Sequence, residues 1–302
     1  MFQHLIIPLD GSTLAESVLP TASALAQTLD AKVTLLHIIE RNPPEEIHGE
    51  RHLTSEHEAL VYLRRVAEHA FPENLQVETH VHSSEQKDVA RSIVDHANEF
   101  GTDLVAMCTH GRGGLRTWFF GSIAQQVVSL GKTPVLLVQP GKMDRILSFV
   151  CRRLLVPVDG DPGHEEGLQV AVRLAKVCQA NLHLLMVVHT FSTLPAEQAA
   201  TATLLPGATS EMLDMTEESA QTYLQRLHEQ ISETSIEVTS EVQRGDPAKL
   251  IASAAERVRA DLIVVGTHGK AGMEAFWSGS MAPKISRRSH VPLLLVPVHV
   301  KP

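Results

Sequence analysis

The amino-acid sequence contains one long pattern twice. The segment FQHLIIPLDGS returns later as RRLLVPVDGDP, and THGRGGLRTWFFGS returns as THGKAGMEAFWSGS. Asp10 and Asp159 are 149 residues apart, whereas Gly121 and Gly279 are 158 residues apart, so the second copy is nine residues longer. A repeat of this length predicts two copies of one domain, each able to bury its own core.

Length and composition agree with two domains, which we expect at residues 1–142 and 151–302 of the 302-residue chain. With 26 basic against 35 acidic residues, the chain has no general electrostatic attraction for nucleic acid, and we expect a small molecule or a protein as its partner. Three cysteines without a CxxC pair are typical of a reducing compartment. The chain shows no signal-peptide pattern and no apolar run long enough to span a bilayer, which predicts a cytoplasmic protein.

Short β-branched or leucine-rich runs alternate with longer helical patterns in both copies. In the first copy we expect strands at Leu5–Leu9, Lys32–Ile39, Gln76–His82, Asp103–Cys108 and Pro134–Val138. We expect helices between them at Leu14–Leu29, Glu56–Ala70, Val89–Glu99 and Ser122–Leu130. Strands that alternate with helices predict an α/β fold, with a mostly parallel sheet, helices on both faces and right-handed crossovers.

The second copy repeats the series of strands. They are expected at Leu154–Val158, Asn181–Val188, Ile236–Gln243, Asp261–Gly266 and Pro292–Val296. The extra length of this copy falls in Thr190–Glu211, which is rich in Ala and Thr and is interrupted by Pro195 and Pro206. We expect a mobile loop there, which could include a helical piece.

The residues that the two copies share follow their first and fourth strands. Asp10 and Asp159 come directly after the first strand, and a Thr-His-Gly segment after the fourth strand leads to Gly121–Ser122 and Gly279–Ser280. Ligands of open parallel sheets bind at the carboxyl ends of the strands. Glycines let a backbone approach an anion, and each Gly-Ser pair would open a helix whose N-terminal amides favour negative charge. The sequence therefore predicts a phosphate site, although either serine alone could be a plain N-cap.

These residues resemble the pattern of the universal stress protein family, which is Gly, two residues, Gly, nine residues, then Gly-Ser or Gly-Thr. The second copy fits the pattern throughout, with Gly266, Gly269, Gly279 and Ser280. The opening LLVPVDG and the closing VPLLLV extend the resemblance over nearly the whole chain. The resemblance implies two tandem Rossmann-like (adenine nucleotide alpha hydrolase-like) domains, each with a five-stranded mostly parallel sheet and helices on both faces.

The resemblance also implies a ligand. In nucleotide-binding members, the aspartate after strand one lies by the adenosine and a backbone position near the end of strand two meets the adenine, which here correspond to Asp159 and Val187. The glycine segment and the Gly-Ser pair would hold the ribose and the phosphates. Such members bind ATP or another adenine nucleotide, often with a divalent ion such as Mg²⁺ on the phosphates. They act as stress-response regulators more than as catalysts.

The first copy departs from the family pattern at two positions. Cys108 stands where the first glycine is expected, and Lys87 matches Gly245 of the second copy. The remaining positions are kept, with Asp10, Ile38, Gly111, Gly121 and Ser122. Because a side chain in place of a glycine could obstruct a ligand, we expect the second domain to be the better nucleotide site and the first to be weakened or altered.

Dimers of the family pair their fifth strands across a two-fold axis, and the matching strands here are Thr133–Gln139 and Val291–Pro297. Each is an apolar edge that needs to be covered. We therefore expect the tandem chain to make this contact internally, as an intramolecular pseudo-dimer. Another face would then be left for a homodimer.

Two other kinds of function compete with nucleotide binding, a protein-interaction module and a nucleotide enzyme. A member of the family that has lost nucleotide binding would act as an interaction module for a protein partner, through its own contacts or through Thr190–Glu211. A related nucleotide enzyme would need an SGGxDS or HxGH signature, and the chain has neither, so we expect at most slow ATP hydrolysis. His48, His52 and His57 lie among acidic residues without HExxH or CxxC, which favours a solvated polar loop over a zinc site.

Overall fold

The structure, a computed structural model, describes residues 1–109, 122–140, 149–194, 196–267 and 281–298. The strands of the first half are β1 (His4–Pro8), β2 (Lys32–Glu40), β3 (Glu46–Ile47), β4 (Glu50–Arg51), β5 (Val77–Gln86), β6 (Leu104–Cys108) and β7 (Val135–Val138). Those of the second half are β8 (Arg153–Val158), β9 (Asn181–Val188), β10 (Val238–Arg244), β11 (Leu262–Thr267) and β12 (Leu293–Pro297). All ten expected strands are present, and β3 and β4 are additional.

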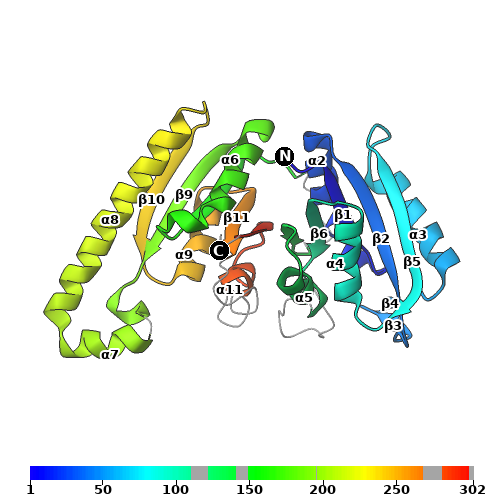
Figure 1. Cartoon of the computed structure of the whole chain (residues 1–302), viewed down its shortest axis with the longest axis horizontal. Helices are drawn as coiled ribbons and strands as arrows, with labels where there is room; N and C mark the ends of the chain where they lie inside the picture. Colours follow the sequence, from blue (N-terminus) through cyan, green and yellow to red (C-terminus); the bar gives the residue numbers. More distant parts are fainter. Residues whose placement is uncertain (110–121, 141–148, 195, 268–280, 299–302) are drawn as a thin grey trace.

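Ten of these strands form one continuous sheet, in the order β10-β9-β8-β11-β12-β7-β6-β1-β2-β5. Within this sheet, the strand pairs of each half are parallel, and the halves meet through the antiparallel pair β7 and β12, with Leu136 opposite Leu294. In Figure 1 the first half lies on the right and the second on the left. The parallel five-stranded unit of each copy and the internal pairing of the two fifth strands are therefore confirmed.

Helices cover both faces of the sheet, as expected. The first half has α1 (Thr13–Glu16), α2 (Leu19–Leu29), α3 (Glu56–Ala70), α4 (Val89–Glu99) and α5 (Ser122–Leu130). The second half has η1 (Pro162–His164), α6 (Glu166–Cys178), η2 (Phe191–Thr193), α7 (Ala196–Leu204), α8 (Pro206–Ser232), α9 (Pro247–Arg257) and α11 (Met281–Ser286). One core lies beneath α2, α3, α6 and α8 and the other beneath α4, α5, α9 and α11, and each core runs across both halves.

The single helix expected at Leu14–Leu29 is wrong, because the structure has α1 and α2 with a break between them. Pro20 has no N–H to donate to the carbonyl of Glu16, and its ring would clash with that carbonyl in a continuous helix. The hydroxyl of Ser17 instead donates to the carbonyl oxygen of Leu14 at 2.7 Å and ends α1. The break lies beside the carboxyl end of β6, so it shapes the candidate site described below.

The loop expected at Thr190–Glu211 is wrong, whereas the helical piece that was allowed within it is confirmed. This segment forms η2, α7 and the first turns of α8, which has 27 residues. Its alanines favour helix, and Pro206 occupies the first turn of α8, where its missing N–H is not needed. Figure 1 shows α7 and α8 at the outer end of the second half. Despite the length of α8, no helix in the described ranges is both long and apolar enough to cross a membrane.

A repeated aspartate fastens the start of the first strand in each half. The carboxylate of Asp103, just before β6, accepts hydrogen bonds from the backbone N–H groups of Gln3 and His4, at 2.8 and 3.0 Å. The carboxylate of Asp261, just before β11, accepts from the N–H groups of Arg152 and Arg153, both at 2.9 Å. These bonds join the first and fourth strands of each half at the end of the sheet opposite to the candidate ligand sites.

Three histidines pack together between the edge strand β5 and helix α4. The ring centroids of His80 and His82 lie 5.0 and 4.9 Å from that of His96, and Nδ1 of His82 is 3.3 Å from Nε2 of His96. Burial, and then the positive charge of His96, lowers the pKa of His80 and of His82, whereas the carboxylate of Glu99 opposes the shift. The fold therefore favours the neutral form of both imidazoles.

We expect the protein to lose stability as the pH falls from about 7.5 to about 5.5. Within this window the unfolded chain binds protons at its histidines that the folded chain, with its lowered pKa values at His80 and His82, does not bind. Denaturant midpoints measured across the window should therefore fall toward acid pH, with a shallower slope in His80→Gln/His82→Gln. Equal slopes for the variant and the wild type would show that these imidazoles are not the groups responsible.

Candidate functional site

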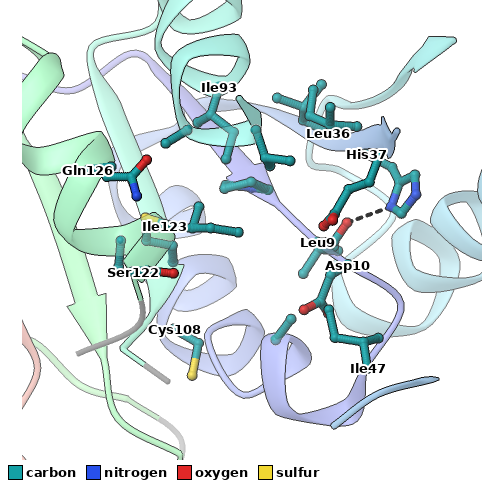
Figure 2. Close-up of a pocket in the computed structure, with 18 of the residues that line it drawn as sticks. Leu9, Asp10, Leu36, His37, Ile47, Ile93, Cys108, Ser122, Ile123 and Gln126 are labelled. Carbon is teal, nitrogen blue, oxygen red and sulfur yellow. Dashed lines mark hydrogen bonds between the residues drawn. The ribbon is translucent and has the colours of Figure 1, made fainter. Parts of the chain in front are cut away.

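A pocket of about 480 Å³ opens at the carboxyl ends of β1, β2 and β6 in the first half. The N-terminal turns of α4 and α5 and the hairpin β3–β4 complete its wall (Figure 2). The strand order β2-β1-β6 shows that the chain turns to opposite sides of β1 here, which is the switch point where ligands of parallel sheets bind. A volume of this size is within the range of small-molecule and cofactor sites.

Three of the site residues expected in the first domain line this pocket. Asp10 follows β1, Ile38 lies near the end of β2, and Ser122 begins α5. Figure 2 shows Asp10 and Ser122 on opposite sides of the hollow, with Ile123 reaching between them. Gly111 and Gly121, the other two residues expected in this site, lie outside the described residues.

The carboxylate of Asp10 is held in place by its own loop. Its Oδ1 accepts hydrogen bonds from the backbone N–H and the hydroxyl of Ser12, at 2.9 and 2.6 Å. Its Oδ2 lies 3.8 Å from Nε2 of His48, so the His48 imidazole lies next to the same carboxylate. Because Ser12 occupies only one oxygen, the other remains directed toward His48 and the pocket.

The histidine-rich segment folds into the hairpin β3–β4 rather than the solvated polar loop expected from the sequence. Its two-residue turn consists of His48 and Gly49, both with positive φ (53° and 82°), as a type I′ turn requires. Glu50 accepts hydrogen bonds from the N–H and hydroxyl of Thr13, which lower the pKa of the Glu50 carboxyl. These bonds fasten the hairpin to the start of α1 and place His48 over the pocket.

The two departures of the first copy leave the pocket open. Cys108 and Lys87 both line it, and its volume is still about 480 Å³. The sulfur of Cys108 accepts a hydrogen bond from the hydroxyl of Ser17 at 3.3 Å, in the break between α1 and α2. The cysteine thus contacts the helix layer, and Lys87 places a positive charge at the pocket wall.

Several lining residues were not anticipated from the sequence. His37 is 1% exposed, and its Nδ1 bonds the carbonyl oxygen of Leu9 at 2.8 Å, which joins the ends of β2 and β1 (Figure 2). Ile93 and Met107 add apolar side chains to the lining of the pocket. These two have the pattern of ordinary core residues, whereas a histidine inside an apolar strand was a signal that could have been used.

The second domain repeats the aspartate arrangement with a different histidine. Oδ1 of Asp159 accepts from the backbone N–H of Asp161 at 3.1 Å, and its Oδ2 lies 2.8 Å from Nδ1 of His164. His164 comes from η1, whereas His48 comes from a hairpin that the second half lacks at this point. Val187 lies in β9 and is partly exposed, at the position that matches Ile38.

The first glycine of the second motif packs against a helix. A Cβ added to Gly167 of α6 would lie 2.7 Å from the backbone nitrogen of Gly266, and one added to Gly266 would lie 3.2 Å from the carbonyl oxygen of His164. The first half has Val18 and Cys108 at these positions, next to the broken helix. The second half therefore needs a glycine at position 266 because helix α6 packs closely there, whereas the first half accommodates the Cys108 side chain. Gly269, Gly279 and Ser280 lie outside the described residues.

No group of three or more His, Cys, Asp or Glu side chains in the described part of the chain is arranged to hold a metal ion. His48 contacts Asp10, His52 is 2% exposed, and His57 lies on α3.

Comparison with known proteins gives the same result for both halves. The family model described as universal stress protein family matches residues 1–139 and again 151–297. A universal stress protein of Methanocaldococcus jannaschii, MJ0531, is 31% identical over 147 residues, which are 48% of this chain and 81% of that protein. The universal stress protein YxiE of Bacillus subtilis is 28% identical over 151 residues, 46% of this chain and 100% of that protein.

Solved structures support the fold of the whole chain. A universal stress protein from Archaeoglobus fulgidus aligns with a TM-score of 0.65 at 19% identity, covering 98% of this chain and 96% of that one. The functionally unknown protein PA1789 from Pseudomonas aeruginosa aligns with a TM-score of 0.69 at 15% identity, covering 98% and 93%. At such identities the likeness concerns the fold alone. With its family model matched over both halves, the chain belongs to the universal stress protein family and carries two of its domains in tandem.

Proposed function

We propose that the protein is an adenine-nucleotide-binding regulator and that the pocket of the first domain holds one nucleotide. The observation that carries this proposal is the pocket at the switch point of the sheet, with Asp10, Ile38 and Ser122 on its wall. Family resemblance supplies the ligand class, because nucleotide-binding members use the matching positions. The proposal therefore combines a hollow of suitable size with residues of suitable chemistry.

Each part of an adenine nucleotide would meet a different wall of the pocket. The main chain of β2 at Ile38 would meet the adenine, and the carboxylate of Asp10 would accept hydrogen bonds from the ribose hydroxyls. The first turn of α5 at Ser122, where the helix dipole favours negative charge, would face the phosphates, and the Lys87 ammonium would add positive charge. Mg²⁺, where present, would be carried by the phosphates of the nucleotide.

The second domain is proposed as the tighter of two sites. Asp159, Val187 and Gly266 lie at the ends of β8, β9 and β11, as in the first domain. This domain carries the complete glycine pattern in its sequence, with Gly269, Gly279 and Ser280. We propose that both sites serve to sense or hold nucleotide, with at most slow ATP hydrolysis. We further propose that a protein partner binds the nucleotide-occupied and the empty forms with different affinities.

Nucleotide released by denaturing the purified protein, identified by mass spectrometry, tests the ligand class. Titration of stripped protein with ATP and Mg²⁺ in a calorimeter should then give two binding events of unequal affinity. Absence of both released nucleotide and binding heat would contradict the proposal. Two equal events would keep the function but overturn the ranking of the two sites.

A second candidate function, contact with another protein, is favoured by an apolar surface at the end of the second half. We name this surface the apolar tip; its residues are Phe191, Leu204, Leu205, Met212 and Met215, which are 45%, 80%, 57%, 46% and 67% exposed. Several large apolar side chains with this exposure on neighbouring elements favour an interaction site. Phe191, Leu204 and Leu205 lie in the segment that lengthens the second copy, and Met212 and Met215 follow it in α8.

We propose that a second copy of the chain covers the apolar tip. Sedimentation velocity over a range of concentrations should show a dimer that Leu204→Glu/Met215→Glu weakens at least tenfold, about 1.4 kcal/mol. Val61→Glu, on the outer surface of α3 where the side chain is 54% exposed, is the matched control. A monomer at all concentrations, or a dimer unaffected by the double variant, would rule out this occupant.

A further inference from the structure

Two of the three cysteines lie together where the linker enters the second domain. All three cysteines are outside disulfides, and Cys108 is in the other half of the chain. Cys151 is two residues before β8 and is 7% exposed, whereas Cys178 is the last residue of α6 and is partly exposed. Both belong to the same apolar core. They are separated by 27 residues in sequence but are neighbours in the fold.

The backbone around the pair is firmly held. The N–H of Asn181 donates to the carbonyl oxygen of Arg152 at 2.8 Å, and Arg153 pairs with Asn181 in the parallel ladder of β8 and β9. The N–H groups of Arg152 and Arg153 also donate to Asp261, as described above. Thus the segment that carries Cys151 and the turn that follows Cys178 are joined by hydrogen bonds immediately next to the two thiols.

The two cysteine side chains are close enough for each to affect the pKa of the other, and they are not equivalent. The hydrogen bond from Cys151 lowers the pKa of the Cys178 thiol, against the effect of burial. The same hydrogen bond, together with burial, raises the pKa of the Cys151 thiol. Because the thiolate is the reactive form of cysteine, the more exposed Cys178 is the better nucleophile and the buried Cys151 is the group that reacts second.

The first copy shows what packing alone requires at these positions. Phe2 and Leu29 match Cys151 and Cys178, and both are apolar residues in or against the same core. The fold is therefore satisfied there by hydrocarbon side chains, and it does not require sulfur at both positions. The alternative to a chemical role is that both cysteines act only as small apolar residues of the core.

We propose that Cys151 and Cys178 form a redox-modification site that a hydroperoxide oxidises to a disulfide. The Cys178 thiolate attacks the O–O bond of the peroxide, which gives a sulfenic acid and releases water from hydrogen peroxide. The Cys151 sulfur then attacks the sulfenic sulfur, the S–S bond forms, and a second water leaves. The two thiols lose two electrons and two protons in total, and the peroxide accepts them. A thiol reductant reverses the reaction.

The disulfide would join the end of the interdomain linker to α6. At its other end this helix carries Gly167, packed on Gly266, and it follows the turn that places His164 on Asp159. Oxidation at one end of α6 would thus restrain a helix that contacts the candidate site of the second domain. The inference does not depend on nucleotide binding, since it concerns only the two thiols and the peroxide.

Thiol counting on the intact wild-type protein tests this proposal. Fully reduced protein is treated with hydrogen peroxide in its native state, denatured, and labelled with N-ethylmaleimide for mass spectrometry. We expect the number of labels to fall from three to one without added oxygen, peptide mapping to find Cys151 joined to Cys178, and dithiothreitol to restore three labels. Three labels after peroxide, stable oxygen addition at Cys178, or a disulfide that includes Cys108 would overturn the proposal.

Two variants separate the pair from the remaining thiol. Cys178→Leu installs the residue that the first copy has at this position, and it should keep two labels with and without peroxide. Cys108→Ser should still lose two labels, from two to none. A loss of labels in Cys178→Leu equal to that of the wild type would overturn the assignment. Because the main result comes from the wild type, it stands even if one variant folds poorly.

Discussion

Replacing Gly167 with alanine should destabilise the second domain by about 2 to 3 kcal/mol. The added Cβ would lie 2.7 Å from the nitrogen of Gly266, 3.1 Å from its Cα and 3.3 Å from the carbonyl carbon of Val265. All three are backbone atoms of β11, so no flexible side chain can move aside, and α6 itself must shift. Denaturant unfolding followed by circular dichroism should show the lower midpoint.

Gly207→Ala is the matched control for this prediction. Gly207 also lies in a helix, α8, but a Cβ there would meet nothing within 4 Å. Alanine should therefore stabilise the protein slightly at this position, by about 0.5 kcal/mol, because it restricts the unfolded chain. If the two substitutions had the same sign, the close approach of α6 to β11 would not be the cause of the effect.

Filling the pocket of the first domain should remove one nucleotide-binding event. Val89 begins α4 on the wall of the pocket, and its side chain is partly exposed, so a larger indole at this position would extend into the pocket. In Val89→Trp, we expect binding of ATP at this site to weaken by at least about 100-fold, or about 2.7 kcal/mol. Calorimetric titration of the variant should then retain only the event that belongs to the second domain.

The same substitution at an unrelated position provides the control. Val61→Trp places an indole on the outer surface of α3, where valine is 54% exposed, and it should leave both binding events unchanged. Both events surviving in Val89→Trp would place the first-domain nucleotide elsewhere. Loss of both events would point instead to coupling between the two domains.

The positions of the sheet strands along the chain, and their mostly parallel arrangement, could be predicted from the sequence. Buried parallel strands are short apolar runs that differ clearly from the amphipathic helices between them. Three helices were predicted with the bounds observed, at Glu56–Ala70, Val89–Glu99 and Ser122–Leu130. The break at Pro20 was missed, and Thr190–Glu211 was expected to be a loop with at most a helical piece, whereas most of it is helical. Both places depend on proline. Proline is tolerated in the first turn of a helix, so Pro20 begins a new helix within an apolar pattern that looks continuous, and Pro206 begins α8 instead of interrupting a helix.

The candidate site could be predicted in part. Asp10 and Ser122 were predicted because the repeat marks them, and Ile38 because of the family resemblance; all three line the pocket. The hairpin that places His48 over Asp10 has no counterpart among the described residues of the second half, so comparison of the two copies could not reveal it. The meaning of Cys108 also depended on tertiary structure, since Gly266 is explained by the approach of α6 and not by a ligand alone.

A crystal structure of the protein grown with saturating ATP and Mg²⁺ tests the central claim most directly. The account predicts a nucleotide in the first-domain pocket, with its adenine at the main chain of Ile38, its ribose at Asp10 and its phosphates at the first turn of α5. An empty first-domain pocket under these conditions, or a nucleotide bound only outside it, would contradict the account.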